Sequence, residues 1–314
     1  MQLRPLVSII SPFYNEGLGV LKFKEAITNV LNSLQEYDFE IICIDDGSTD
    51  NTLSKLIAVA HHDHRFRIIE LSRNFGKEAA MTAGIDEAKG NCIIPIDADL
   101  QDPPALIGKM LLAWQQGNEV VLAKRIDRST DSFAKRKTAQ LFYRLHNVVS
   151  NLQIPEDVGD FRLMDRVVVD ALKKLPERQR FMKGLFAWVG FKTITVEYAR
   201  NARSTGITKF SGWRLWNFAI EGITSFSLVP LKVWTYIGLF GSVFAIFYAT
   251  FIIIRTWIFG IDLPGYASLL VVMLFFGSLQ LMSLGIIGEY IGRIYFESKQ
   301  RPIYLIKKQH QFKK

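Results

Sequence analysis

The sequence has few cysteines and lacks a leader-like N-terminus. Its two cysteines, Cys43 and Cys92, lie inside apolar runs, a pattern typical of buried thiols in a reducing compartment and not of a disulfide framework. The segment from Met1 to Pro5 leads directly into a short apolar run. Because no basic region precedes a long hydrophobic stretch there, no secretory signal peptide is predicted and export is not expected.

Charge is missing from two long stretches near the C-terminus. Residues 233–254 and 266–287 contain no Asp, Glu, Lys or Arg, and each run is long enough to cross a hydrocarbon layer about 30 Å thick. A core helix of a soluble domain rarely reaches this length without a polar face. In a chain of 314 residues with 49% hydrophobic residues and a net charge of +8, we therefore expect a mixed part up to about residue 229 and a membrane-spanning part after it.

In the mixed part, short apolar runs alternate with helical patterns. Strands are predicted at residues 6–10, 39–44, 67–71, 91–96 and 119–123, and helices at residues 21–34, 77–88 and from residue 104. This alternation predicts an α/β, Rossmann-like fold with a mostly parallel central sheet and a ligand beyond the strands' carboxyl ends. Polar clusters at residues 12–16, 45–50 and 97–102 each follow a strand, so we expect them to converge on one cleft.

An acidic pair follows the fourth predicted strand. If the strand continues through them, Asp97 and Asp99 share a face because side chains alternate, and Gln101 has the same parity. Hard oxygen donors of this kind suit Mg²⁺ or Mn²⁺, and Mg²⁺ is commonly held by one or two carboxylates together with substrate phosphates. A diphosphate ligand is therefore implied. The alternative is that Asp97, Asp99 and Asp102 are loop and helix-cap residues before Pro103.

The two common glycine-rich phosphate loops, G-x-G-x-x-G and G-K-S/T, are absent from the turns after these strands. Phosphate would then be held by metal and basic side chains. The candidates near predicted turns are Arg125, Arg203 and Lys209, although each is also compatible with a solvated surface charge.

Two further clusters have both a functional and a structural interpretation. In residues 156–162, Asp157 and Asp160 could line the cleft, but capping or pairing with Arg162 or Arg166 explains the pattern equally well. Three histidines at positions 61, 62 and 64 suggest a metal site. They follow a helix predicted to end near residue 60, where cationic side chains are favoured, so a structural role is predicted.

The segment that begins at residue 211 is aromatic, with Trp213, Trp216 and Phe218, and has the basic residues Lys209 and Arg214 beside this run. Such a segment suits a helix in the membrane interface, although a buried core helix would look similar. The connection 255–265 carries one Arg and one Asp, whereas the segment after residue 288 is rich in Lys and Arg. The positive-inside rule therefore predicts a multi-pass protein of the inner membrane whose N-terminal part and C-terminus are both cytoplasmic.

Taken together, these strings resemble the inverting nucleotide-sugar glycosyltransferases that act on polyprenyl phosphates, the bactoprenol glucosyltransferase and dolichol-phosphate mannose synthase family. The resemblance covers nearly the whole chain and rests on the order of these motifs: SPFYNEG, IDDGSTDNT, LSRNFGKEAA, IDADLQDPP, DVGDFRLMDR, ARSTGITKF, the two apolar runs, GEYIGRIY and RPIY. Each string alone is weakly specific, and their order together with the paired runs is strong.

The resemblance assigns roles to individual residues. It implies a nucleotide-binding set of Pro12, Tyr14, Glu16, Asp46 and Asp97. It implies Mg²⁺ or Mn²⁺ on Asp97, Asp99 and Gln101. It implies an acceptor and phosphate set of Arg125, Arg203, Thr208 and Lys209, where Thr208 and Phe210 replace the Ser and Tyr of the family's turn. Asp99 and Asp157 are the expected catalytic residues, with Asp157 orienting acceptor or sugar beside the anomeric carbon.

The resemblance also implies an activity and a domain order. A hexose, with glucose from UDP-glucose as first choice and a mannosyl or aminosugar donor left open, would pass to undecaprenyl or another polyprenyl phosphate at the membrane. No nucleic-acid partner is expected, and a homo-oligomer is left open. The expected domains are a cytoplasmic catalytic domain at 1–210, an interfacial helix at 211–230, two spans at 231–288 and a basic tail at 289–314.

Two other classes of protein are less compatible with the sequence. A processive polysaccharide synthase would need more spans and a Q-x-x-R-W signature, where this chain has Gln179-Arg180-Phe181-Met182-Lys183. A non-enzymatic membrane scaffold or lipid carrier would need no metal-binding carboxylates.

Overall fold

Strands and helices alternate through the first part of the chain in the computed structural model, which describes residues 4–125, 158–178, 180–198, 229–260 and 265–312. Their order is β1 Leu6–Phe13, α1 Val20–Asn32, β2 Asp38–Asp45, α2 Thr52–His62, β3 Phe66–Leu71, α3 Lys77–Glu87, β4 Cys92–Pro95 and α4 Leu106–Gln115. The predicted alternation is confirmed, and the predicted boundaries of these elements differ from the observed ones by a few residues.

The second part of the sheet contains one strand, β6 Val158–Asp165, that runs opposite to its neighbours. The other elements of this part are β5 Val120–Arg125, α6 Arg166–Lys173, α7 Met182–Trp188 and β7 Thr193–Tyr198. Together with β8, Ile306–His310, near the C-terminus, the described strands form one sheet in the order β7-β5-β6-β4-β1-β2-β3-β8. Parallel pairing joins β4, β1, β2 and β3 and also joins β5 to β7, whereas β6 is antiparallel to β4 and β5. The prediction of a mostly parallel sheet is confirmed.

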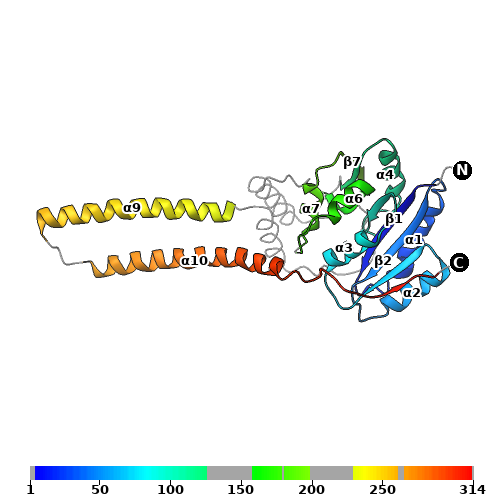
Figure 1. Ribbon diagram of the computed structural model, residues 1–314, viewed down its shortest axis with the longest axis horizontal. Helices are drawn as coiled ribbons and strands as arrows, with labels where there is room; N and C mark the ends of the chain where they lie inside the picture. The colour runs from blue at the N-terminus through cyan, green and yellow to red at the C-terminus, as the bar shows by residue number, and fades with distance from the viewer. Residues whose placement is uncertain (1–3, 126–157, 179, 199–228, 261–264, 313–314) are drawn as a thin grey trace.

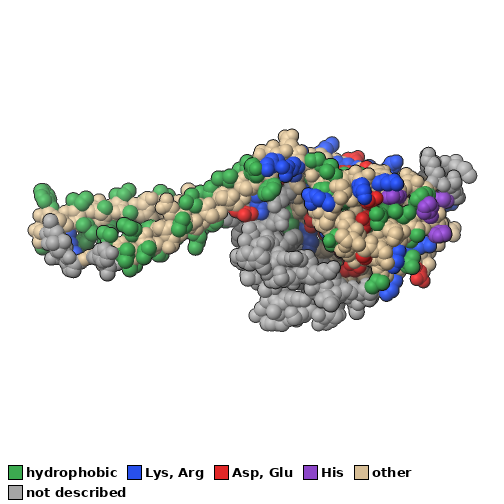
Figure 2. Space-filling view, turned by 90° about the horizontal axis from the view of Figure 1, so that it is seen from below, with side chains coloured by type: hydrophobic (Ala, Val, Ile, Leu, Met, Phe, Trp, Pro, Cys, Tyr) green, Lys and Arg blue, Asp and Glu red, His purple; other side chains and the backbone are tan. Residues whose placement is uncertain are grey.

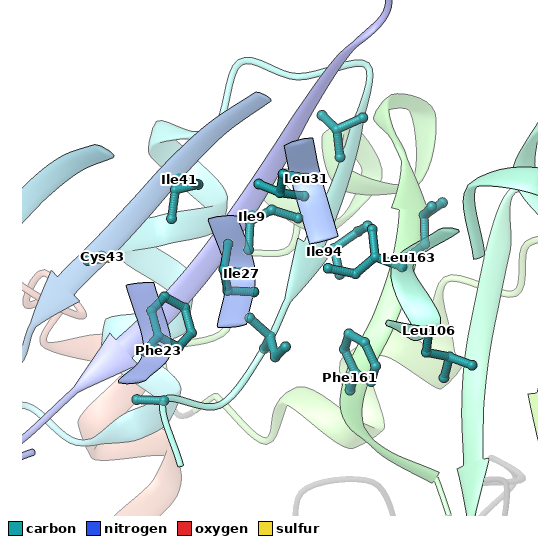
Figure 3. Close-up of a cluster of buried hydrophobic side chains, with 14 of the residues drawn as sticks. Ile9, Phe23, Ile27, Leu31, Ile41, Cys43, Ile94, Leu106, Phe161 and Leu163 are labelled. Carbon is teal, nitrogen blue, oxygen red and sulfur yellow. The ribbon is translucent and has the colours of Figure 1, made fainter. Parts of the chain in front are cut away.

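Helix α1 shows how the apolar pattern produces the core. Its buried residues Phe23, Ile27 and Leu31 recur every four positions, so they lie on one face of the helix. Figure 3 shows this face packed over Ile9 of β1 and Ile41 of β2. Full burial of such side chains stabilises the fold by about 1.5–3 kcal/mol each, which holds α1 on the sheet and helps to fix the positions of the strands' carboxyl ends.

Two long helices leave the sheet as a hairpin. Helices α9 Val229–Phe259 and α10 Tyr266–Ser298 lie side by side and extend far from the α/β part (Figure 1). Their apolar windows have mean hydropathies of 2.3 and 2.2, and none of either window is buried inside the protein. Hydrophobic side chains cover the hairpin, while charged side chains gather on the α/β part (Figure 2). Both helices are long and apolar enough to cross a membrane, and neither is a core helix of the described protein.

The predicted spans lie inside these helices, but α10 is longer than predicted. It continues past residue 288 to Ser298. Near this end, the carboxylate of Glu297 accepts hydrogen bonds from the backbone N–H of Arg178 at 3.0 and 3.1 Å. The Arg178 guanidinium donates to the carbonyl of Arg301 at 2.6 Å. The hairpin is therefore tied to the segment between α6 and α7.

The C-terminal tail returns to the sheet, which the sequence did not predict. Strand β8, Ile306–His310, pairs antiparallel with β3 and forms one edge. Glu70 of β3 accepts from Lys307 at 2.6 Å and lies 3.2 Å from the His310 ring. Residues 306–310 of the expected basic tail therefore belong to the same sheet as β1, and the expected division into domains stays a prediction.

The same tail accounts for the clustered histidines. The His61 ring stacks on Phe312 with 3.6 Å between the ring centroids. His64 Nδ1 lies 3.1 Å from the Phe312 carbonyl oxygen. Both side chains thus help to hold the C-terminal segment against α2, in agreement with the predicted structural role.

Candidate active site

The loops after β1 and β2 are joined by a dense set of hydrogen bonds. Asn15 donates its backbone N–H to the Ser48 hydroxyl at 3.0 Å, and its side-chain oxygen accepts from Thr49 N–H at 2.9 Å. Glu16 N–H donates to the Thr52 hydroxyl at 2.9 Å. The polar clusters after these two strands therefore meet at one edge of the sheet, as predicted from parallel strands.

Asp46 extends this edge to the loop after β3. Its two carboxylate oxygens accept the backbone N–H groups of Phe75 at 2.7 Å and Gly76 at 2.9 Å, and the residue is 2% exposed. Burial raises the pKa of Asp46, while the two backbone hydrogen bonds oppose the increase. This carboxylate has a structural role in the loop, and its contact with a nucleotide stays a prediction.

Three other members of the predicted nucleotide-binding set lie at or just beyond the end of β1. Pro12 lies near the end of β1, opposite Ile44 of β2, and Tyr14 is 42% exposed just beyond the strand. Glu16 is half-buried in the same loop. The structure brings these side chains to the carboxyl edge of the sheet, where a ring and a ribose could contact them.

The prediction that Asp97 and Asp99 alternate along a strand is wrong. Strand β4 ends at Pro95, and both aspartates lie in a turn in which Leu100 has a φ of 53°. A left-handed leucine costs roughly 1–2 kcal/mol, and such strain often marks functional turns. Asp99 Oδ1 accepts the backbone N–H of Gln101 at 3.2 Å. The turn, and not strand parity, therefore sets the positions of Asp97, Asp99 and Gln101.

The helix-cap alternative for these residues is also not observed. Helix α4 begins after Ala105, which makes no capping hydrogen bond through its side chain. Asp102 instead accepts a hydrogen bond from the Tyr198 hydroxyl at the end of β7. Burial and this carboxylate raise the pKa of Tyr198 to about 12, although a hydrogen bond with Arg125 opposes the increase. Arg125 therefore lies beside the turn that carries Asp97 and Asp99.

Lys77 is a site residue that the sequence reasoning missed. Its ammonium lies 2.7 Å from Asp97 Oδ1 and 2.6 Å from Asp160 Oδ2. Lys77 is the first residue of α3, so it follows the loop after β3 at the same sheet edge. Its place at a helix start directly after a strand was the signal that could have found it. Asp160 is thereby an ion-pair partner of the cluster, although the sequence had suggested Arg162 or Arg166 instead.

The acidic groups around Lys77 influence one another. Burial raises the pKa of Asp97, Lys77 opposes this, and the carboxylates of Asp160 and Asp99 add to the increase. Burial and Asp160 raise the pKa of Glu78 to about 7. Four carboxylates thus lie close enough to repel one another, and they create an environment that attracts cations.

The donor set fits a divalent cation held jointly with a ligand. Among the residues that the structure describes, no group of three or more His, Cys, Asp and Glu side chains is spaced to hold a metal. Asp97 and Asp99 still supply two hard carboxylates, and a cation already lies 2.7 Å from Asp97 in the form of the Lys77 ammonium. Mg²⁺ sites of this composition take their remaining ligands from water and substrate phosphates.

Several predicted site residues lie outside the described residues. These are Asp157, Arg203, Thr208 and Lys209, together with the interfacial helix predicted at 211–230. Their predicted roles stay predictions.

The sequence and the fold can be compared with known proteins. The family model of glycosyl transferase family 2 matches residues 8–173. The chain is 52% identical over 305 residues to the SfII prophage-derived bactoprenol glucosyl transferase of Shigella flexneri, which covers 97% of this chain and 98% of that protein. It is 51% identical over 302 residues to the prophage bactoprenol glucosyl transferase homolog of Escherichia coli K12, covering 96% and 98%.

Solved structures are more distant. Glucosyl-3-phosphoglycerate synthase from Mycobacterium tuberculosis, in complex with Mn²⁺, UDP and phosphoglyceric acid, aligns with a TM-score of 0.47 and 20% identity over 70% of this chain and 76% of that chain. The mannosyltransferase PcManGT from Pyrobaculum calidifontis, in complex with GDP-Man and Mn²⁺, aligns with a TM-score of 0.46 and 17% identity over 70% and 61%.

The mostly parallel Rossmann-like sheet, the acidic turn after β4 and the full-length relatives define a glycosyltransferase. The chain belongs to glycosyl transferase family 2, and the resemblance predicted from the order of its motifs is confirmed.

Proposed function

We propose that this glycosyltransferase moves a hexose, with glucose from UDP-glucose as first choice, onto a polyprenyl phosphate at the cytoplasmic face of the membrane, with Mg²⁺ or Mn²⁺ as cofactor. The observation that carries the proposal is the combination of the acidic turn at Asp97 and Asp99 with two unburied apolar helices in one chain. Relatives of the same length, about half identical, are named bactoprenol glucosyl transferases, which supports a lipid phosphate acceptor.

The acceptor phosphate needs little activation. A phosphate monoester with a second pKa near about 6 is mostly dianionic at neutral pH, so its oxygen can attack the anomeric carbon directly. As that C–O bond forms, the bond to the nucleoside diphosphate breaks and its electron pair leaves with the diphosphate. The sugar's configuration inverts in such a single displacement. Asp157 then has an orienting role beside the anomeric carbon, and no strong general base is required.

The chain's own residues bind and neutralise the two anions. Asp97, Asp99 and Gln101 would hold the divalent cation, which supplies Lewis-acid stabilisation of the leaving diphosphate when bound. Lys77, already 2.7 Å from Asp97, and Arg125 add positive charge at the same edge. Arg203, Thr208 and Lys209 would hold the acceptor phosphate, since cationic hydrogen bonds offset the repulsion between two anions. Catalysis then rests on positioning and electrostatic stabilisation.

The membrane hairpin gives the enzyme access to its lipid substrate. At about 1.5 Å per residue, α9 and α10 would span roughly 46 and 50 Å, which exceeds the ~30 Å hydrocarbon layer. Both helices approach the α/β part at the same end of the hairpin (Figure 1). This geometry supports two spans with the catalytic part and both termini on one side. The interfacial helix at 211–230 enters the proposal from its aromatic sequence alone.

One experiment tests the proposed activity. Purified full-length protein, in detergent or nanodiscs, is incubated with polyprenyl phosphate and a panel of UDP- and GDP-linked hexoses and aminosugars. We expect a lipid-linked hexose whose anomeric configuration is opposite to that of the donor. A mannosyl or aminosugar product would replace glucose in the proposal, and the absence of transfer from every donor would contradict it.

Substitution Asp99→Ala tests the metal site. Loss of one carboxylate ligand should reduce transfer by at least about 100-fold with Mg²⁺ or Mn²⁺, because the charge on the leaving group is no longer stabilised. Asp38→Ala is the matched control, since Asp38 is exposed at the opposite end of β2. Near wild-type turnover of Asp99→Ala would remove the metal from the proposal.

A further inference from the structure

A cavity of about 170 Å³ lies between helix α7 and the face formed by β5, β6 and β7. Its wall is mostly apolar and includes Val158, Phe186 and Phe191, while its charged lining residues are Arg162 and Lys183. A cavity of only about 10–15 Å³ is enough to hold one buried water molecule. The cavity is therefore large enough for a polyatomic ligand.

Arg162 is the unusual feature of this cavity. The residue is 6% exposed, and its guanidinium lies 4.0 Å from the centre of the Phe186 ring. One terminal nitrogen donates to the Gly159 carbonyl at 2.7 Å, but the buried Nε–H has no hydrogen-bond partner among the described residues. A buried donor left without a partner costs roughly 1–3 kcal/mol, and more when it is charged. A donor kept in this state is available for a ligand.

The neighbouring carboxylates do not accept a hydrogen bond from the Arg162 Nε–H. Asp160 and Glu78 are its acidic neighbours, yet Asp160 is paired with Lys77 at 2.6 Å. One oxygen of each of these carboxylates is also buried without a hydrogen-bond partner among the described residues. Lys183 of α7 acts on both carboxylates and lines the cavity beside Arg162. Two cations therefore face the space, and neither forms a direct salt bridge among the described residues.

We propose that this cavity is a phosphate-binding site, in which Arg162 and Lys183 hold the oxyanion and the apolar wall accommodates what is attached to it. A phosphate group accepts hydrogen bonds from a guanidinium and an ammonium together, which would satisfy the buried Nε–H. The ligand has two possible sources, a free phosphate or the head group of a lipid monophosphate. The second source rests on the proposed function, whereas the first does not.

The cavity is connected to the acidic turn through Asp160 and Lys77. Asp160 contacts Lys77, and Lys77 contacts Asp97, while Asp160 also interacts with Arg162 and Lys183. An oxyanion in the cavity would compete with Asp160 for these two cations. Occupancy of the cavity would then alter the electrostatic surroundings of the turn that carries Asp97.

The test measures phosphate binding directly. Full-length protein in detergent, without any sugar donor, is titrated with inorganic phosphate by calorimetry at constant ionic strength. We expect one saturable site in the wild type. Lys183→Gln should weaken binding about tenfold or more, because it removes a charged hydrogen bond. Ala187→Leu, which fills the cavity without changing charge, should also weaken binding, and Lys174→Gln, at the exposed residue that follows α6, should not.

Arg162→Lys is a further variant, and the two variants above keep the test decisive if it does not fold. The absence of a saturable site in the wild type, or wild-type affinity in both Lys183→Gln and Ala187→Leu, would overturn the proposal. Transfer kinetics then separate the two sources. If phosphate competes with polyprenyl phosphate and Lys183→Gln raises the KM for that lipid alone, the site holds the lipid head group. If inhibition or activation is non-competitive, the site holds free phosphate. Phosphate binding without any transfer activity would leave this site standing while removing the proposed function.

Discussion

At the scale of single residues, Gly47 shows how the loops of the site depend on close backbone contact. It has a φ of +67°, and a Cβ atom added there would lie 2.4 Å from the carbonyl carbon of Arg73 and 2.6 Å from the Asn74 nitrogen. The preceding residue, Asp46, accepts the N–H groups of Phe75 and Gly76. The loops after β2 and β3 are therefore in direct backbone contact at Gly47, which leaves no room for a side chain.

Gly47→Ala should destabilise the protein more than a positive φ alone explains. The left-handed conformation costs an alanine about 1 kcal/mol or more, and the clash with the backbone adds about 1–3 kcal/mol. Gly117→Ala is the matched control, because Gly117 has a φ of +85° but no atom within 4 Å of an added Cβ. Chemical denaturation of both variants measures the difference, and equal losses would show that the contact at Gly47 does not matter.

Residue-level prediction succeeded where the chemistry is local and failed where it depends on the path of the chain. Asp97 and Asp99 could be selected because two carboxylates after an apolar strand are a local pattern. Their arrangement could not be predicted from strand alternation, because β4 ends at Pro95 and a turn with a left-handed Leu100 follows. The Lys77 and Asp160 ion pair joins residues 83 positions apart, and no periodicity in the sequence specifies such a contact.

At the scale of elements, β8 is held to the sheet by one buried acid. Glu70, whose side chain is 10% exposed, pairs with Lys307 and His310. Burial alone would raise its pKa, but the hydrogen bonds from Lys307 and His310 lower it below the ordinary value of 4.5. Because the folded pKa is depressed, the stabilising contribution of Glu70 is complete above about pH 4.5 and is lost as the pH falls through the folded pKa.

Glu70→Gln should therefore reduce stability in a pH-dependent way. At pH 7 we expect a measurable loss of stability from the missing ion pair with Lys307, and this difference from the wild type should shrink as the pH falls below 4.5. Urea denaturation across this range measures it. Glu36→Gln, at an exposed position, is the control, and a difference that does not depend on pH would contradict the role of the ionised carboxylate.

The element most difficult to foresee was β8 itself. Residues 306–310 are rich in lysine and follow an apolar helix, so the positive-inside rule explained them without any strand. Their pairing with β3 depends on an edge that the first part of the chain leaves open. By contrast, β1 to β4 could be predicted because each is an apolar run followed by a turn and a helix, which favours parallel strands.

At the scale of the whole molecule, the chain returns from the proposed membrane part to the sheet where it began. The chain leaves the α/β part at α9, returns through α10 and ends as β8 beside β3. Glu297 and Arg178 connect the end of α10 to the segment before α7. The end of α10 is thus held against the α/β part, which would keep the cleft close to the headgroups.

The proposed topology can be tested with variants that each add one cysteine to the natural sequence, which keeps Cys43 and Cys92. Cys43 and Cys92 are buried, and burial raises the pKa of both thiols. Neither should therefore react with a thiolate-selective, membrane-impermeant maleimide.

The two added cysteines lie at opposite ends of the molecule. Lys308→Cys is at an exposed position of β8, and Phe259→Cys is at the far end of α9, where the phenylalanine is 81% exposed. In sealed vesicles of known orientation, we expect Lys308→Cys to be labelled only from the cytoplasmic side and Phe259→Cys only from the opposite side. Wild-type protein serves as the unlabelled control. Labelling of both variants from the same side would mean that the hairpin does not cross the bilayer, and the catalytic part would then need another way to reach a lipid acceptor.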